Sequence, residues 1–190
     1  MARWEPNARE RLVRAALDLF TEQGYDATTV NQIADRAGLT KTTFFRHFPD
    51  KREVLFAGQD IHARLLADGI AAAPATATPL EAVSAGLDAL TASFRDERRE
   101  FSARLRPVLA GHSELRERAV FKRVGLAAVM ADALRERGVP EPTASLAAEL
   151  GVRAFYQAFE QWADLTNGQT CTDLARIALA ELRAATAALD

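Results

Sequence analysis

The stretch TVNQIADRAGLTKTTFFRHFPDK, residues 29–51, carries the signals of two short helices separated by a glycine. Thr29 and Gln32 have the spacing of a capping box, in which two side chains satisfy free backbone amides at a helix start. Gly38 tolerates the left-handed backbone that ends many helices, and Thr40 is a suitable N-cap for a second helix. The pattern predicts two helices joined by a tight turn.

The second of these helices has one apolar face and one polar face. Phe44 and Phe48 stand four residues apart and are expected to face a core. The side chains left for solvent are cations, hydroxyls and one aromatic ring: Lys41, Thr42, Thr43, Phe45, Arg46 and His47. Residues 36–52 contain five Lys or Arg against one acid, a balance that attracts phosphates through counterion release. We therefore predict a DNA-binding helix-turn-helix; the alternative is an ordinary helical hairpin with a solvated basic face.

The segment TTVNQIADRAGLTKTTFFRHFPDKREVLF, together with the preceding ARERLVRAALDLFTEQGYDATTV, resembles the N-terminal domain of the TetR family of bacterial transcriptional repressors. The resemblance runs from about Asn7 to Phe56. The remaining two thirds of the chain is similar only in its general helical character. Phe45 stands where the family usually has tyrosine, and Thr42 where glycine is frequent. Without a phenol hydroxyl, Phe45 is expected to make an apolar contact to a sugar or a thymine methyl group.

The resemblance also implies roles for individual side chains. Lys41, Thr42 and Thr43 would contact bases or backbone at the start of the recognition helix. Thr29, His47 and Lys51 would hold phosphates. Asn31 is either a base reader, since asparagine suits adenine, or a plain exposed helix residue. The predicted DNA-binding set is Thr29, Asn31, Lys41, Thr42, Thr43, Phe45, Arg46, His47 and Lys51.

Composition is ordinary for a globular protein, with 48% hydrophobic and 26% charged residues among 190. The net charge of −2 makes the local basic patch, rather than the overall field, the feature that would attract DNA. The sequence has no apolar run long enough to span a membrane and no signal-peptide pattern at its start, so we expect a cytoplasmic protein. Cys171 is the only cysteine, which excludes an intramolecular disulfide.

Helical signals continue through the rest of the chain. We expect an all-α fold of about nine helices, with a three-helix helix-turn-helix domain at residues 1–50 and a larger effector-binding and dimerisation domain at residues 51–190. Capping boxes are predicted at Asn7 and at Asp50, the latter starting a helix to about residue 72. Thr78 and Pro79 should start a core helix, and Pro107 should kink or end a helix over residues 96–110.

The last two long helices carry apolar residues on more than one face. The resemblance implies that they form a four-helix interface in a homodimer, which would present two recognition helices to successive major grooves of a palindromic operator. The predicted interface residues are Phe159, Trp162, Leu174, Ile177 and Leu182. The alternative is that these side chains fill the core of one subunit.

The resemblance further implies an effector cavity in the C-terminal helices, for a small and largely apolar ligand. Aromatic and aliphatic candidates are joined by a few polar ones: His62, Phe94, Phe101, Arg104, Leu105, Phe121, Val124, Arg153, Phe155, Tyr156 and Phe159. For each aromatic residue the alternative is plain core packing.

Catalytic patterns are missing from the sequence. His47, His62 and His112 occur in neither HExxH nor ExxH spacing, and there is no nucleophile elbow, phosphate-binding glycine loop or dinucleotide fingerprint. We predict no enzyme activity, no cofactor and no metal site. Repression is favoured by the resemblance alone, and a ligand-independent helical DNA-binding or adaptor protein is the alternative function.

Overall fold

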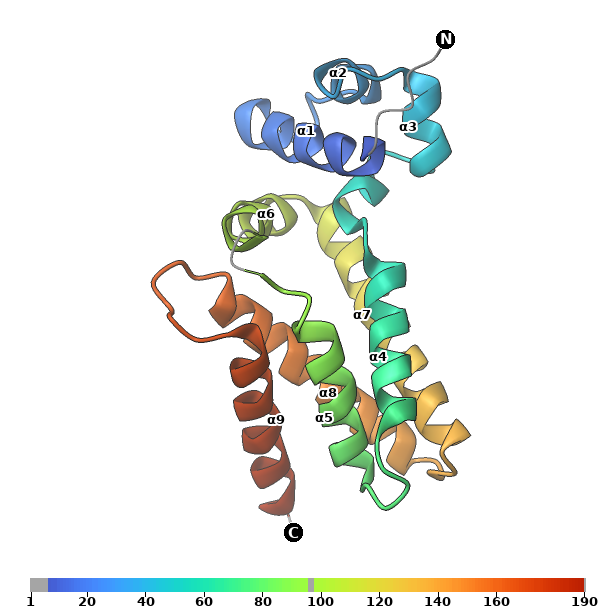
Figure 1. Ribbon diagram of the computed structural model, residues 1–190. Helices are drawn as coiled ribbons and strands as arrows, with labels where there is room; N and C mark the ends of the chain where they lie inside the picture. The colour runs from blue at the N-terminus through green and yellow to red at the C-terminus, as the bar shows by residue number, and fades with distance from the viewer. Residues whose placement is uncertain (1–6, 96–97, 190) are drawn as a thin grey trace. The chain divides into compact units, whose positions relative to one another are not determined.

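The computed structural model describes residues 7–95 and 98–189, and this part of the chain contains helices but no strand (Figure 1). The α-helices are α1 Ala8–Gln23, α2 Val30–Arg36, α3 Lys41–His47, α4 Gln59–Ala72, α5 Pro79–Thr91, α6 Arg99–Gly111, α7 Ser113–Glu136, α8 Thr143–Trp162 and α9 Cys171–Ala187. A 3-10 helix, η1 Arg52–Phe56, lies between α3 and α4. The predicted all-α class with about nine helices is confirmed for the described residues.

The chain divides into two compact units. The N-terminal unit comprises the residues up to Gly58 together with Arg104–Ala119, and the helical body comprises Gln59–Ala103 and the residues from Val120 onward. The second part of α6 and the first part of α7 thus belong to the N-terminal unit. The domain division at residue 50 expected from the sequence stays a prediction.

Three helices of the N-terminal unit share one core. Leu12 and Leu17 of α1, Ile33 of α2 and Phe44 of α3 are all completely buried. A helix of seven residues, such as α2 or α3, is too short to be stable by itself. This shared core therefore holds the two short helices in place.

The start of α1 differs from the prediction. Asn7 adopts a left-handed backbone conformation, with φ of 77°, and its side chain makes no capping hydrogen bond. Asparagine tolerates this conformation better than most residues. Glu10 does not complete a capping box and instead accepts a hydrogen bond from Arg14, one turn along the helix, at 2.9 Å. The predicted capping box is wrong here.

The helix predicted from Asp50 to about residue 72 is interrupted. The Asp50 carboxylate accepts hydrogen bonds from the backbone amides of Arg52 and Glu53, at 2.8 and 3.1 Å, so it does cap a helical turn. That turn is only η1. Gly58 follows with φ of 108°, a value that favours glycine, and α4 starts after it.

Helices α4 and α5 of the body cross at very short range. A Cβ atom on Gly69 would lie 2.8 Å from the carbonyl oxygen of Ala85, and one on Gly86 would lie 2.8 Å from the Ile70 side chain. The two glycines therefore let the helix backbones approach each other. The predicted start of α5 is confirmed, because Thr78 forms a complete capping box and is followed by Pro79 at the first position.

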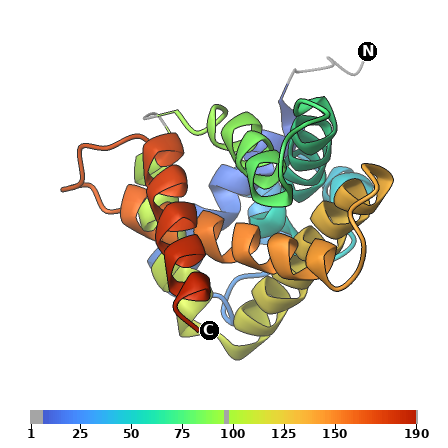
Figure 2. The same ribbon diagram turned by 90° about the horizontal axis from the view of Figure 1, so that it is seen from below.

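The remaining helices complete the body. Helix α8 packs on α9, and α5 contacts both of them as well as α4, as Figures 1 and 2 show from two directions. Their shared core includes Leu87 of α5 together with Met130 and Leu134 of α7, all three fully buried. Pro107 lies inside α6, which continues to Gly111, so the proline does not end the helix. No helix within the described residues combines the length and apolar character needed to cross a lipid bilayer.

Candidate nucleic-acid interface

The turn between α2 and α3 is fixed by backbone hydrogen bonds and by a glycine. Gly38 has φ of 65°, and the amides of Gly38 and Leu39 donate to the carbonyls of Asp35 and Ala34, each at 2.9 Å. The Arg11 guanidinium of α1 donates to the carbonyl of Ala37. These bonds satisfy carbonyls that a helix end leaves free. The relative orientation of α2 and α3 is thereby set.

Each short helix also has a capped start. Thr29 accepts from the amide of Gln32, whose side chain accepts from the amide of Thr29 at 2.8 Å, so the predicted capping box is present. The Thr40 hydroxyl accepts from the amide of Thr43 at 3.1 Å and lies 3.0 Å from the Thr43 hydroxyl. Thr43 is therefore tied to the cap and only half-exposed.

Helix α3 turns its other side to solvent. Lys41, Thr42, Phe45 and Arg46 are exposed, and Asn31 of α2 is exposed as well. Phe45 is 48% exposed, and its ring meets the buried Phe44 ring edge-on at 5.5 Å between centroids. A large apolar ring on the solvent side of a helix is available to an apolar partner such as a thymine methyl group.

Lys51 is held within the N-terminal unit. Its ammonium donates to the carbonyls of Tyr25 and Thr28, at 2.7 and 2.9 Å, and lies 4.0 Å from the centroid of the Tyr25 ring. Burial lowers the pKa of Lys51 from its usual value. The side chain therefore fastens the loop between α1 and α2, and the phosphate contact expected from the sequence stays a prediction.

His47 occupies a partly enclosed position. Its Nε2 atom is buried and has no hydrogen-bond partner in the described structure. Burial, together with the charges of Arg46 and Arg9, lowers the pKa of His47. A lowered pKa keeps the ring neutral at pH 7. The phosphate contact expected for His47 would thus be made by a neutral imidazole unless the phosphate raises its pKa.

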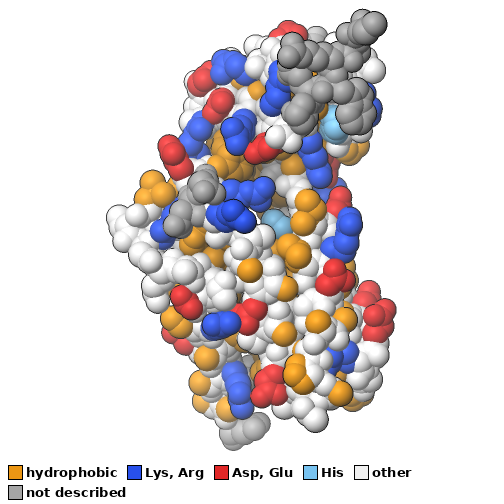
Figure 3. All heavy atoms as spheres, in the orientation of Figure 1, with side chains coloured by type: hydrophobic (Ala, Val, Ile, Leu, Met, Phe, Trp, Pro, Cys, Tyr) orange, Lys and Arg blue, Asp and Glu red, His pale blue; other side chains and the backbone are white. Residues whose placement is uncertain are grey.

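The basic patch is smaller than the sequence count suggests. Arg36 forms two hydrogen bonds with Glu22 of α1, at 3.0 and 2.8 Å, and Arg52 pairs with Asp50 at 2.9 Å. Glu22 lies outside the counted segment and approaches Arg36 only in the fold. On the face of the molecule that Figure 3 draws, Lys and Arg side chains (blue) and Asp and Glu side chains (red) are interspersed. Lys41 and Arg46 remain as the exposed cations of α3.

The structure brings together about half of the predicted effector-binding residues. The Phe94 ring meets the rings of His62, Phe155, Phe159 and Trp162, with centroids 5.4–5.8 Å apart. We call these five residues the aromatic cluster. Burial, with a contribution from Arg98, lowers the pKa of His62 to about 4. Tyr156 packs against this cluster through Phe155.

Other predicted effector residues lie elsewhere. Arg104 forms an ion pair with Asp18 of α1 at 2.7 Å, and it and Leu105 belong to the N-terminal unit. Phe101 is half-buried on α6 in the body, and Phe121 is 63% exposed on α7. The eleven candidates therefore do not converge on one site.

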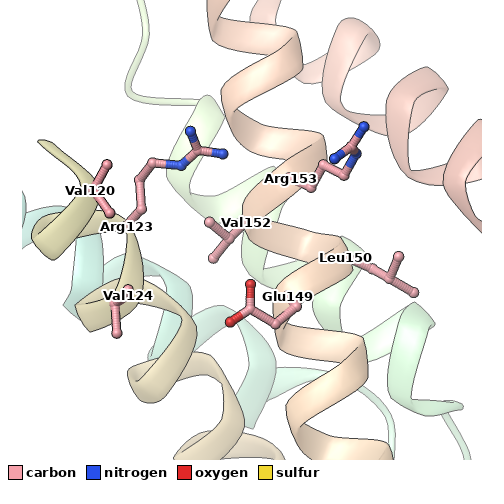
Figure 4. Close-up of a pocket in the computed structure, with 7 residues that line it drawn as sticks. All are labelled: Val120, Arg123, Val124, Glu149, Leu150, Val152 and Arg153. Atoms are coloured by element: carbon pink, nitrogen blue, oxygen red, sulfur yellow. The ribbon is translucent and has the colours of Figure 1, made fainter. Parts of the chain in front are cut away.

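Val124 and Arg153 line a groove between α7 and α8 (Figure 4). It has a volume of about 380 Å³ and is lined by Val120, Arg123, Val124, Glu149, Leu150, Val152 and Arg153. Five of these were not among the sequence candidates. Their positions three and four residues apart on each helix are the only signal that the sequence offers for them.

The predicted dimer residues differ in exposure. Trp162 and Leu174 are buried in a second core cluster of the same subunit, with Phe159 packed against it. Side chains buried in this way have little surface left for a second subunit. Ile177 is 45% exposed on α9, and Leu182 is half-buried. Ile177 is thus the predicted interface residue with the most surface to offer.

The capped helix pair, its fixed turn and the exposed face of α3 define a helix-turn-helix protein of the DNA-binding class. Residues 12–57 match the family model described as bacterial regulatory proteins, tetR family. The N-terminal part of the chain belongs to this TetR family.

Curated relatives agree with this assignment. The regulator TcmR of Streptomyces glaucescens is 39% identical over 46% of this chain and 39% of its own length. The activator FasR of Mycolicibacterium smegmatis is 37% identical over 37% of this chain and 32% of its own. The chain thus spans less than half the length of the curated relatives that it matches first.

The fold likeness extends over both units. Bacillus subtilis FadR, solved in complex with stearoyl-CoA, has a TM-score of 0.61 and 18% identity, covering 90% of this chain and 95% of that one. At this identity the likeness establishes the fold only.

Proposed function

We propose that a homodimer of this protein binds a palindromic DNA operator through α3 and represses transcription. A small, largely apolar ligand in the helical body would then release it from DNA. The observation that carries the proposal is the exposed face of α3, where Lys41, Thr42, Phe45 and Arg46 stand on a helix whose start, turn and buried side are all fixed.

DNA binding, rather than catalysis, has the family as its support, since TcmR is named as a transcriptional regulator and FasR as a transcriptional activator. Activation is the second candidate for the effect on transcription, because one relative, FasR, is named as an activator. Among the predicted readers, Lys41 suits guanine or phosphate and Phe45 suits a thymine methyl group. Asn31, at the start of α2, is exposed and free to contact an adenine or the backbone.

A ligand of this kind is supported by two features of the body. The aromatic cluster and the groove between α7 and α8 are both largely apolar with a few polar groups, as ligand sites typically are. One solved protein with this fold, B. subtilis FadR, was obtained with stearoyl-CoA, which has a long apolar chain. We place the effector in the body on these grounds.

A mobility-shift assay tests DNA binding. The probes are the DNA flanking the protein's own gene and a pool of genomic fragments, with competitor DNA of random sequence. We expect retention of specific fragments that survives the competitor. Equal affinity for all fragments would favour an architectural protein, and retention of none would favour an adaptor that binds protein partners.

A further inference from the structure

The groove between α7 and α8 has an apolar wall that is largely exposed. Val120 and Val124, one turn apart on α7, are 59% and 61% exposed. Val152 of α8 is only 4% exposed and forms the base between the two helices. Removing apolar surface of this kind from water is favourable. The wall therefore favours an apolar occupant.

The charges of the groove are separated along its length. In Figure 4, the guanidiniums of Arg123 and Arg153 lie at a similar level on either side of α8, and the Glu149 carboxylate lies below them, on the side of α8 that faces α7. The Arg123 guanidinium is 4.5 Å from the centroid of the Tyr156 ring, which holds it in position. None of the ion pairs between described residues involves these three side chains. Both guanidiniums are thus available to an anion.

We propose that this groove binds an amphipathic carboxylate, an apolar chain whose anionic end lies at Arg123 and Arg153. The chain lies along Val120 and Val124, and Glu149 opposes the reversed orientation by repelling the carboxylate. Arginine suits this role because its planar guanidinium can donate two hydrogen bonds to one carboxylate. The volume of about 380 Å³ lies within the range of small-molecule sites. That this ligand is the effector rests on the proposed function.

Calorimetric titration of the full chain tests the site with three probes: decanoate, decan-1-ol and decyltrimethylammonium. They share a chain and differ only in the charge of the head group. We expect decanoate to bind once per subunit and more tightly than the other two. Arg153→Gln should weaken decanoate about tenfold and leave decan-1-ol unchanged, because only the ionic contact is lost.

Two further variants separate the chain from the head group. Val124→Gln should weaken decanoate and decan-1-ol alike. Glu149→Gln removes a negative charge, so the affinity for decyltrimethylammonium should not rise. The affinity for decanoate should stay the same or increase. Arg64→Gln, at an exposed arginine of α4 outside the groove, is the matched control and should change nothing. Arg153 and Val124 are exposed, so we expect both variants to fold. Thermal unfolding followed by circular dichroism checks this.

Decanoate that binds equally well to the wild type, Arg153→Gln and Val124→Gln, or that does not bind at all, would overturn the proposal. The titration uses no DNA. Failure of the protein to bind an operator would therefore contradict the proposed function without affecting the measured affinity for decanoate. If both hold, decanoate should lower operator affinity in the wild type and do so about tenfold less effectively in Arg153→Gln. Unchanged operator affinity at saturating decanoate would reject the groove as the effector site.

Discussion

At the scale of single residues, two roles of Lys51 can be tested separately: fastening the loop between α1 and α2, and the predicted contact with a phosphate. Lys51→Ala removes the donor from the carbonyls of Tyr25 and Thr28 and should lower the free energy of unfolding by about 1–3 kcal/mol. Denaturant titration measures this loss, and Lys41→Ala, at an exposed lysine, is the control that should show almost none. An unchanged midpoint for Lys51→Ala would contradict the fastening role.

The phosphate contact of Lys51 has a separate signature. Its loss should weaken binding to all DNA sequences and lower the slope of log affinity against log salt by about one. If Lys51→Ala lowered the stability but left the salt slope unchanged, Lys51 would stabilise the fold without contacting a phosphate.

His62 should make the stability of the body depend on pH. Its pKa is about 4 in the folded protein, whereas an unfolded histidine titrates near pH 6.5, so the unfolded state binds more protons between these values. The free energy of unfolding should therefore fall as pH drops from about 6.5 to 4, and rise again on returning to neutral pH.

His62→Phe keeps a ring against Phe94 and removes the titration. Relative to the wild type, this variant should gain about 2–3 kcal/mol in free energy of unfolding between pH 7 and pH 4.5. Denaturant titrations of both proteins at the two pH values measure the difference and cancel the contribution of the carboxylates. A difference that stays constant with pH would show that His62 is not held neutral.

At the scale of elements, α3 depends on its cap. Thr40→Ala removes the acceptor for the amide of Thr43 and should cost about 1 kcal/mol, a large loss for a helix of seven residues. Operator affinity should fall with it, and Thr40→Ser should retain both. Thr78→Ala removes the equivalent cap from α5 and should destabilise the protein without weakening DNA binding. If Thr40→Ala and Thr78→Ala changed the DNA affinity equally, the cap of α3 would contribute no more to DNA binding than the cap of α5 does.

Local signals predicted the elements well. The caps at Thr29, Thr40 and Thr78 lie within three residues of their partners, so the sequence displays both members of each pair. Asn7 and Asp50 show the limit of the same signal. A matching spacing cannot reveal that Asn7 is left-handed, nor that Gly58 separates η1 from α4.

Contacts between segments that are distant along the chain could not be predicted from the sequence. The end of α8 is held by Arg99, which donates to the carbonyls of Trp162, at 2.6 Å, and Asp164, at 3.2 Å. The pairing of Arg36 with Glu22 is similarly non-local and reduces the basic patch. For the effector, residue type alone could not show which candidates share a site, because the aromatic residues gather around Phe94 while Val124 and Arg153 line the separate groove between α7 and α8.

At the scale of the whole molecule, the proposed dimer makes α9 the surface to perturb. Ile177→Glu places a charge on an exposed apolar position, and a two-fold interface would repeat that charge on both sides. Light scattering should show a mass falling from twice 20.7 kDa to 20.7 kDa. Val120→Glu, an equally drastic change on α7, should leave the dimer intact. Dissociation by Val120→Glu instead would move the interface to α7.

In the proposed complex, two copies of α3 read one operator. Selection of bound sequences from a random DNA library by the purified protein tests it most directly. We expect an inverted repeat whose half-sites are centred about one helical turn apart, roughly 34–36 Å, with the preference at one position in each half-site changed by Lys41→Ala. A single unrepeated half-site, or a library that shows no enrichment, would contradict it.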